Sequence, residues 1–134
     1  QWDASVNAGF STAATEKLYI PLDPSPDRPT AEKEMRDDNS LRSEVKRLIG
    51  VRQAHPALQS IGEIEFICDG APGKPLCYLR SLGDERILVI INPTDVPYES
   101  GVCGGKIIYS FGTVTDSDGK LAVAGGSAVF MKLK

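Results

Sequence analysis

The opening residues carry the side chains best suited to contact a sugar. Gln1-Trp2-Asp3 and Asn7-Ala8-Gly9-Phe10 bring aromatic, amide and carboxylate groups together within one short stretch. Aromatic faces and hydrogen bonds from such polar groups are what a carbohydrate ring needs. The same residues also fit a plainer interpretation, in which Trp2 and Phe10 anchor a loop to an apolar core.

The other chemistry-bearing residues indicate structural roles rather than a metal or cofactor site. His55 is the only histidine, and its place near the end of a predicted helix favours contact with free carbonyl groups there. Asp116-Ser117-Asp118-Gly119 begins like a calcium loop, but position twelve from Asp116 is Ser127 instead of a glutamate, so we expect a turn. Residues 101–105 are glycine-rich but lack the lysine of a phosphate-binding loop. We therefore expect no metal and no cofactor.

The composition is that of an ordinary globular domain. Of 134 residues, 41% are hydrophobic and 25% are charged, and the formal net charge is −3. The basic surplus expected of a nucleic-acid-binding protein is missing. The longest apolar run, Ile87 to Ile91, has the length of a strand and is far too short for a membrane span. We expect neither a nucleic acid nor a membrane as partner.

The cysteines are few and odd in number. Cys68, Cys77 and Cys103 cannot form a disulfide framework, so we expect semi-buried thiols and favour a reducing compartment such as the cytoplasm. One disulfide remains an alternative, because Cys68 and Cys77 would face each other across a hairpin. The chain starts at Gln1 without a methionine or a signal peptide, which we interpret as a piece of a longer protein.

Residues 1–58 predict an irregular loop followed by one helix. Four prolines punctuate the first 30 residues, and so long a loop in a compact protein favours a functional role. Over residues 40–54, apolar side chains recur at i, i+4, i+7 and i+8 from Leu41, the pattern of an amphipathic helix. Asn39 or Ser40 is expected to cap its start, and Pro56 to end it.

Residues 59–134 predict about seven short antiparallel strands with turns between them. Ile64, Phe66 and Cys68 alternate with two glutamates, which indicates a half-buried strand whose Glu63 and Glu65 are solvated. No pair of carboxylates can be selected as catalytic from this pattern.

The later strands complete the expected sheets. Residues 86–91 are apolar on both faces and are expected at the centre of a sheet. Pro97 predicts an edge strand, while Asp118-Gly119 and Gly125-Gly126 predict hairpin turns. The predicted fold class is mainly β, an antiparallel, Greek-key-like β-sandwich preceded by a loop and one helix.

Six segments in order resemble the α-amylase superfamily of glycoside hydrolases, in its oligo-1,6-glucosidase, α-glucosidase and trehalose-synthase-like branches. Each segment is weak evidence alone, and the ordered set is fairly specific. The segments are Gln1–Asp3, Asn7–Ser11, Leu18–Leu22, Asp38–Leu41, Arg52–Leu58 and Ile87–Pro93.

The resemblance implies a (β/α)₈ barrel followed by a β-sandwich. Residues 1–58 would be a remnant of the barrel, comprising the loop after its eighth strand and its last helix, and residues 59–134 the C-terminal sandwich. Active sites of such barrels lie at the face that carries this loop. The residues thus expected beside an α-glucan or α-glucoside substrate are Gln1, Trp2, Asp3, Asn7, Gly9 and Phe10.

The resemblance also implies what this chain lacks. The family's nucleophile, its acid/base residue and its second aspartate lie on earlier barrel strands, and their motifs do not occur here. We therefore expect no catalytic residue in this chain, and no activity from it alone, although the parent would be a retaining enzyme. The helix face left uncovered is expected either to pack on the sandwich or to bind a second copy of the chain.

Two alternatives of other classes remain open. A carbohydrate-binding module would need a platform of exposed aromatic rings, for which Trp2, Tyr98, Tyr109 and Phe111 are the candidates. A non-catalytic interaction domain would bind no glycan and would have a defined protein partner.

Overall fold

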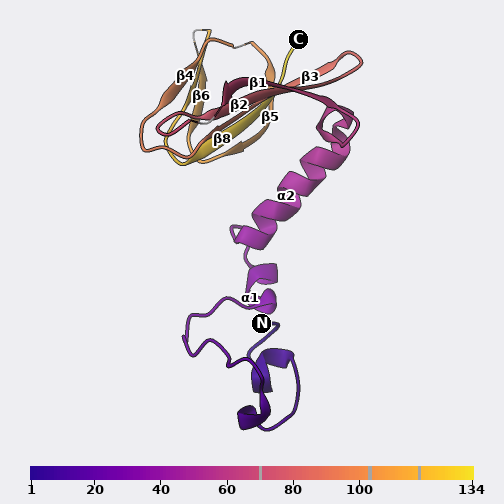
Figure 1. Cartoon of the computed structure of the whole chain (residues 1–134), viewed down its shortest axis with the longest axis vertical. Helices are drawn as coiled ribbons and strands as arrows, with labels where there is room; N and C mark the ends of the chain where they lie inside the picture. Colours follow the sequence, from indigo (N-terminus) through magenta and orange to yellow (C-terminus); the bar gives the residue numbers. More distant parts are fainter. Residues whose placement is uncertain (70, 103, 118) are drawn as a thin grey trace. The chain divides into compact units, whose positions relative to one another are not determined.

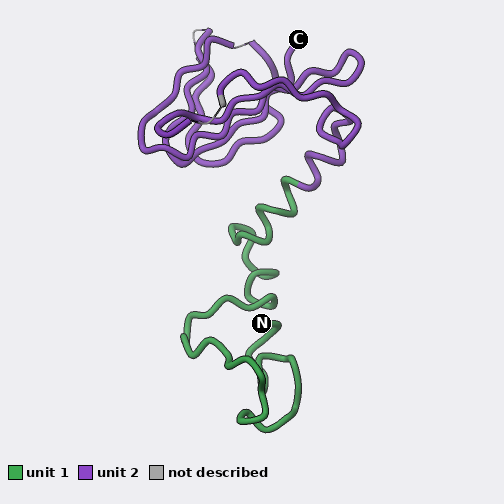
Figure 2. The backbone as a smooth tube through the Cα atoms, in the orientation of Figure 1, with its two compact units in different colours: residues 1–48 green, residues 49–134 purple. Residues whose placement is uncertain are grey.

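The computed structural model describes residues 1–69, 71–102, 104–117 and 119–134. The chain forms two compact units, residues 1–48 and residues 49–134, whose border falls within the long helix α2 (Leu41–Ala54) (Figures 1 and 2). Cys103 and Asp118, and with them part of the expected 118–119 turn, lie outside the described residues.

In its described residues the larger unit is an antiparallel β-sandwich of eight strands, which confirms the predicted fold class, for which about seven strands were expected. One sheet has the strand order β1-β2-β3-β8-β5, and the other has the order β4-β7-β6. The strands are β1 (Glu63–Asp69), β2 (Leu76–Leu82), β3 (Glu85–Asn92), β4 (Tyr98–Ser100), β5 (Lys106–Phe111), β6 (Val114–Ser117), β7 (Lys120–Val123) and β8 (Ser127–Lys132).

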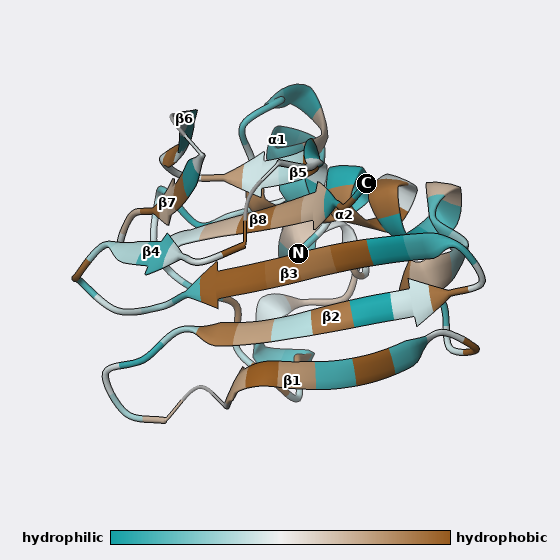
Figure 3. Cartoon of the chain, turned by 90° about the horizontal axis from the view of Figure 1, so that it is seen from above, coloured by the Kyte–Doolittle hydropathy of each residue, from teal (hydrophilic) through white to brown (hydrophobic). Residues whose placement is uncertain are grey.

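The core lies between the two sheets and on the outer face of the larger one. Between the sheets, Leu88 and Ile90 of β3 pack with Leu121 and Val123 of β7. On the opposite face, Ile87 and Val89 pack against Ala57 in η3 (Pro56–Leu58). β3 is therefore buried on both faces, as its continuous apolar run predicts, and it is brown over much of its length in Figure 3.

Strand β1 differs from the prediction, because Ile64 and Phe66 are exposed and not half-buried. The register with β2 shifts by one residue at a β-bulge between Phe66 and Cys68. Phe66 lies opposite Tyr78 on the outer face, whereas Cys68 packs against the core between the sheets. A strict period-2 interpretation of the sequence cannot place both residues correctly, since the bulge reverses the faces within the strand.

Two further expectations concern the connections. β4 is an edge strand, as Pro97 predicts, although it is only three residues long. The expected hairpin at Gly125-Gly126 is wrong, because β7 and β8 belong to different sheets and the chain passes between the sheets there. Glycine is favoured at this crossing because Gly125 lies close to the backbone of Asp95, with which a side chain on residue 125 would collide.

The smaller unit contains the predicted loop and two helices. The loop includes η1 (Val6–Gly9) and η2 (Thr15–Lys17), and it leads into α1 (Ala31–Arg36). Ser40 caps α2 as predicted, since its hydroxyl accepts a hydrogen bond from the Ser43 backbone N–H at 3.2 Å. No helix in the described part of the chain is long and apolar enough to cross a membrane.

Candidate functional site

Backbone hydrogen bonds within the opening loop and to α1 hold the first residues of the chain in place. The Trp2 N–H donates to the carbonyl of Ala8 at 2.9 Å, which closes the loop on itself. The first two carbonyls accept hydrogen bonds at 2.9 Å from the N–H groups of Ala31 and Glu32 at the start of α1. Gln1 and Trp2 are thus fixed by a helix that follows them by some thirty residues in the sequence.

Asn7 is the structural centre of this loop. Asn7 and Ala8 both adopt the left-handed backbone region, with φ of 52° and 54°. Asparagine tolerates this region better than most residues. The buried Asn7 amide donates to the carbonyl of Ala13 at 2.7 Å and to the carbonyl and hydroxyl of Ser11 at 3.1 Å each. The amide donors of Asn7 are therefore engaged by the loop itself.

Trp2 and Phe10 form an exposed aromatic pair. Their ring centroids lie 6.4 Å apart with the planes at 61°, an edge-to-face contact. Each residue retains 59% of its possible exposure, so neither ring is an anchor sunk in a core. Ring surface of both residues is therefore exposed in the described unit.

Asp3 lies behind the aromatic pair as an ionised group. Hydrogen bonds from the Ser5 hydroxyl and the Ser5 N–H hold the pKa of Asp3 below its usual value. A Cβ atom on Gly9 would lie 2.9 Å from Asp3 Oδ2, and Gly9 has φ +77°. The positive φ favours glycine at position 9, and a larger residue there would also displace the Asp3 side chain.

A hollow of about 440 Å³ opens beside these residues. Its polar groups come from Gln1 and Asn7, and Gln1 Oε1 is buried without any hydrogen-bond partner in the described structure. The remaining wall is mostly apolar, with Tyr19 almost fully exposed at its rim. The wall is formed by Phe10, Leu18, Tyr19, Ile20, Pro21 and Leu22.

Residues 18–22 were not among the expected site residues, although they carried part of the family resemblance. The signal available in the sequence was a run of apolar residues within an otherwise polar, proline-rich loop. Such a run in a loop indicates either burial or a binding surface. The structure brings Gln1, Asn7 and Phe10 into the wall of the hollow, places Trp2 against Phe10, and leaves Asp3 and Gly9 supporting the turn.

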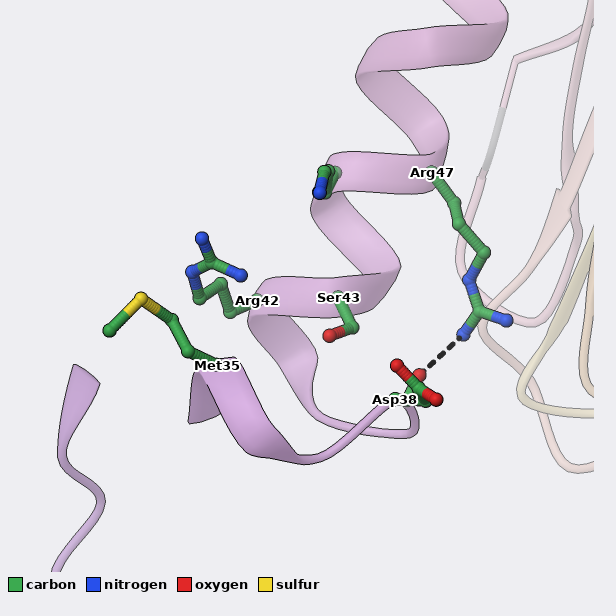
Figure 4. A pocket seen from close by; sticks show the side chains of 6 residues that line it. Met35, Asp38, Arg42, Ser43 and Arg47 are labelled. Atoms are coloured by element: carbon green, nitrogen blue, oxygen red, sulfur yellow. Dashed lines mark hydrogen bonds between the residues drawn. The ribbon is translucent and has the colours of Figure 1, made fainter. Parts of the chain in front are cut away.

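A second hollow, of about 500 Å³, lies where α1 meets the start of α2 (Figure 4). Arg42, Lys46 and Arg47 contribute positive charge, and Arg47 donates to the carbonyl of Asp38 at 3.4 Å. These three basic side chains are exposed. The residues that line the hollow include one carboxylate, that of Asp38, and therefore no facing pair. The hollow therefore offers no acid–base chemistry.

The aromatic candidates for a binding platform in the β-sandwich do not form one. Tyr98 packs against the core, and the Tyr109 ring contacts Phe130 edge-on with centroids 5.2 Å apart. Only Phe111 exposes half of its surface. In the described residues no group of three or more His, Cys, Asp or Glu side chains is arranged to hold a metal ion.

Comparison with known proteins places this geometry in a family. Residues 1–60 match the catalytic domain of α-amylase. The resemblance to the α-amylase family is confirmed. The oligo-1,6-glucosidase of Parageobacillus thermoglucosidasius is 36% identical over 92 residues, which span 69% of this chain and 16% of that enzyme. The trehalose-6-phosphate hydrolase of Bacillus subtilis is 34% identical over 92 residues, with the same coverage of both chains.

The fold comparison extends the α-amylase family likeness over the whole chain. The trehalulose synthase MutB of Pseudomonas mesoacidophila superposes with a TM-score of 0.81 at 26% sequence identity. The match covers 100% of this chain and 24% of the synthase. The β-sandwich and the helix before it therefore occur together in an enzyme about four times as long.

Proposed function

We propose that this chain is the C-terminal portion of an α-amylase-family glycoside hydrolase or glucosyltransferase that acts on α-glucosidic bonds. The observation that carries the proposal is continuity: residues matching the catalytic domain lead through α2 directly into the β-sandwich. The family enzyme MutB shares this arrangement over the full length of the chain. In this proposal, residues 1–58 complete the barrel and residues 59–134 form the C-terminal domain.

The exposed face of α2 supports a missing partner within the same enzyme. Leu41, Val45 and Ile49 keep 76%, 46% and 51% of their possible exposure, although they share the apolar side of the helix. A helix buries such a stripe when its neighbours are present. We assign this face to the barrel, of which α2 would be the last helix.

The role proposed for the opening loop is contact with substrate, not cleavage. Trp2 and Phe10 present ring surface, and Gln1 and Phe10 help to line the adjacent hollow. Glycosidic bond cleavage with retention requires two carboxyl groups about 5–5.5 Å apart. Those groups would come from the rest of the barrel, and the chain alone is proposed to be inactive.

An activity assay tests the second part of this proposal. The purified chain should release no product from p-nitrophenyl α-glucoside, maltose or starch at protein concentrations far above those used for family enzymes. Turnover that follows the purified chain through successive columns would overturn it. The gene itself tests the first part: sequence encoded upstream of Gln1 should contain barrel strands with the family's Asp, Glu and Asp motifs.

A carbohydrate-binding module is the competing function, and it predicts a different result. Titration of the chain with maltooligosaccharides, followed by Trp2 fluorescence, should show no saturable binding, because the surfaces around the hollow would be incomplete without the barrel. In isothermal titration calorimetry, which does not need Trp2 as a reporter, saturable binding that is lost in Trp2→Ala and retained in Phe111→Ala would favour the module. Sedimentation velocity adds a third outcome, since a dimer disrupted by Val45→Glu would show that a second copy covers the α2 face.

A further inference from the structure

The β-bulge in β1 brings two cysteines face to face. Before the bulge, Phe66 lies opposite Tyr78, and after it Cys68 lies opposite Cys77. Without the shift, the continued register would place Leu76 opposite Cys68. The bulge therefore turns Cys68 from the outer face towards the core, where Cys77 is already buried.

Contacts between the side chains show that the two thiols share one site. Cys68 Sγ lies 3.6 Å from the hydroxyl of Tyr98, and the Cys77 thiol interacts with both Cys68 and Tyr98. Neither Cys68 nor Cys77 is in a disulfide; Cys77 is 1% exposed and Cys68 is partly exposed. Cys68 is thus the more exposed residue of the pair.

We infer that Cys68 and Cys77 form a reversible disulfide, a redox modification site that ties β1 to β2 when the protein meets a low-molecular-weight disulfide. Residues directly opposite each other in antiparallel strands have Cα atoms about 4.5–5.5 Å apart. A disulfide requires a Cα separation of about 4.4–6.8 Å. The bond can therefore form without separating or sliding the strands.

The chemistry is two successive thiol–disulfide exchanges. The Cys68 thiolate attacks one sulfur of oxidised glutathione, forms a mixed disulfide, and releases one glutathione thiolate, which takes up a proton. The Cys77 sulfur then loses its proton, attacks Cys68 Sγ and expels the second glutathione. The protein dithiol is oxidised by two electrons, and one glutathione disulfide is reduced to two thiols.

The environments of the two thiols set this order. Burial, aided by the neighbouring Cys68, raises the pKa of the Cys77 thiol to about 12, so Cys77 is a poor first nucleophile. Cys68 is the more exposed of the two and makes the first attack, on a sulfur of oxidised glutathione. Once Cys68 carries glutathione, Cys77 is already in position to displace it, and the mixed disulfide should not accumulate.

The strand that would be tied lies at one edge of the larger sheet, as β5 lies at the other edge. In the described residues β1 pairs with β2 alone. Edge strands open more readily than central ones, because half of their backbone groups have no ladder partner. A cross-link at Cys68 therefore acts on an edge of the sheet, where local opening is easier than at its centre.

Mass spectrometry of the whole chain tests this inference. The protein is equilibrated at pH 8 with defined ratios of reduced to oxidised glutathione, quenched with acid, alkylated and digested. We expect a Cys68–Cys77 cross-linked peptide that disappears on reduction, together with amide hydrogen exchange in residues 63–68 that is roughly tenfold slower in the oxidised form. Cys103→Ser should form the same cross-link, whereas Cys68→Ser should not.

The possible contrary results are distinct. Full alkylation of both cysteines under oxidising conditions would overturn the inference, as would a stable glutathione adduct on Cys68. Pairing of either cysteine with Cys103 in place of the other would also overturn it. The decisive cross-link is measured in the unaltered chain, so the result does not depend on any variant folding correctly.

Discussion

His55 Nδ1 and Glu85 Oε1 lie 2.8 Å apart and join the residue after α2 to the first residue of β3. Glu85 also accepts hydrogen bonds from Lys132 Nζ at 3.0 Å and from the Ala57 N–H at 3.0 Å. Arg80 donates from the neighbouring strand to the carbonyls of Ala57 at 3.1 Å and Gly62 at 3.0 Å. Two charged side chains thus hold η3 on the outer face of the larger sheet.

Glu85 should make the stability of the β-sandwich depend on pH. Burial raises the pKa of Glu85, but the hydrogen bonds from Ala57, His55 and Lys132 outweigh it and lower the value from 4.5 to about 2. A carboxyl with a depressed folded-state pKa stabilises the fold above its unfolded-state value and loses that effect as the pH falls. The stabilisation should be complete above about pH 5 and should disappear between about pH 4.5 and pH 2.

The variant Glu85→Gln isolates this contribution. In urea unfolding at pH 7 it should lower the free energy of unfolding by about 1–3 kcal/mol, the usual worth of hydrogen bonds to a charged group. The difference between the two proteins should shrink as the pH falls from about 4.5 to about 2. Glu99→Gln is the matched control, because Glu99 is 69% exposed and lies 3.7 Å from Lys120, so its loss should change little. A pH-independent difference would contradict the assignment.

Asn92 should be among the most sensitive residues of the sandwich. Its buried amide donates to the carbonyls of Val96 at 2.9 Å, Val123 at 3.0 Å and Ala124 at 3.1 Å, which joins β3 to the end of β7 in the other sheet. Asn92→Ala should lower the free energy of unfolding by about 2–4 kcal/mol, because buried carbonyls lose their donor.

Asn92→Asp serves as the comparison in the same urea unfolding series. It keeps the size of the side chain and replaces the donor by a second acceptor. It should be at least as destabilising as the alanine variant at pH 7, and less so at acidic pH. An Asn92→Asp protein as stable as the wild type would show that the three hydrogen bonds contribute nothing.

Two glycine substitutions should change the stability of the protein in opposite directions. Gly50 lies within α2 with nothing within 4 Å of an added Cβ, so Gly50→Ala should stabilise the helix by up to about 1 kcal/mol. An added Cβ on Gly62 would collide with the Ala57 carbonyl and approach Arg80 Nη2 at 2.9 Å. Gly62→Ala should therefore destabilise the protein by about 1–3 kcal/mol. Thermal unfolding followed by circular dichroism compares both with the wild type, and equal signs would refute the prediction.

Asn7 should control the order of the opening loop without affecting the sandwich. Asn7→Ala removes four hydrogen bonds and leaves alanine in the left-handed region. Amide exchange within residues 1–15 should become roughly tenfold faster or more, whereas exchange in β3 and β8 should not change. Asn7→Gly keeps the backbone preference and loses only the hydrogen bonds, so its effect should be smaller. Unchanged exchange in the loop would mean that Asn7 does not organise it.

The sequence predicted most of the sandwich because its signals are local. The apolar run at residues 86–91 indicated a central strand, and Ser40 indicated the start of α2. The errors arose where a distant contact decides the outcome. The bulge at Ile67 is not visible in an alternating pattern, and Gly125-Gly126 reads as a hairpin unless the sheet of each strand is known.

The candidate site was only partly predictable, for the same reason. The residue types indicated the aromatic and amide groups of the opening loop as candidates, but they did not show which of these groups would form hydrogen bonds within the loop. Asn7 has its donors occupied by the carbonyls of residues up to six positions away, while Gln1 has an oxygen without a partner. His55 was expected to contact helix carbonyls and instead binds Glu85, thirty residues further along the chain.

The edge position of β1 bears on how the protein behaves when concentrated. The strand exposes the apolar side chains of Ile64, Phe66 and Ile67, and exposed apolar residues on an edge strand favour association between molecules. Glu63 and Glu65 flank Ile64 in the sequence, and their carboxylates give each molecule negative charge on this strand. Mutual repulsion between these carboxylates should keep the protein dispersed at low ionic strength, and high salt should screen the repulsion and make the solution turbid.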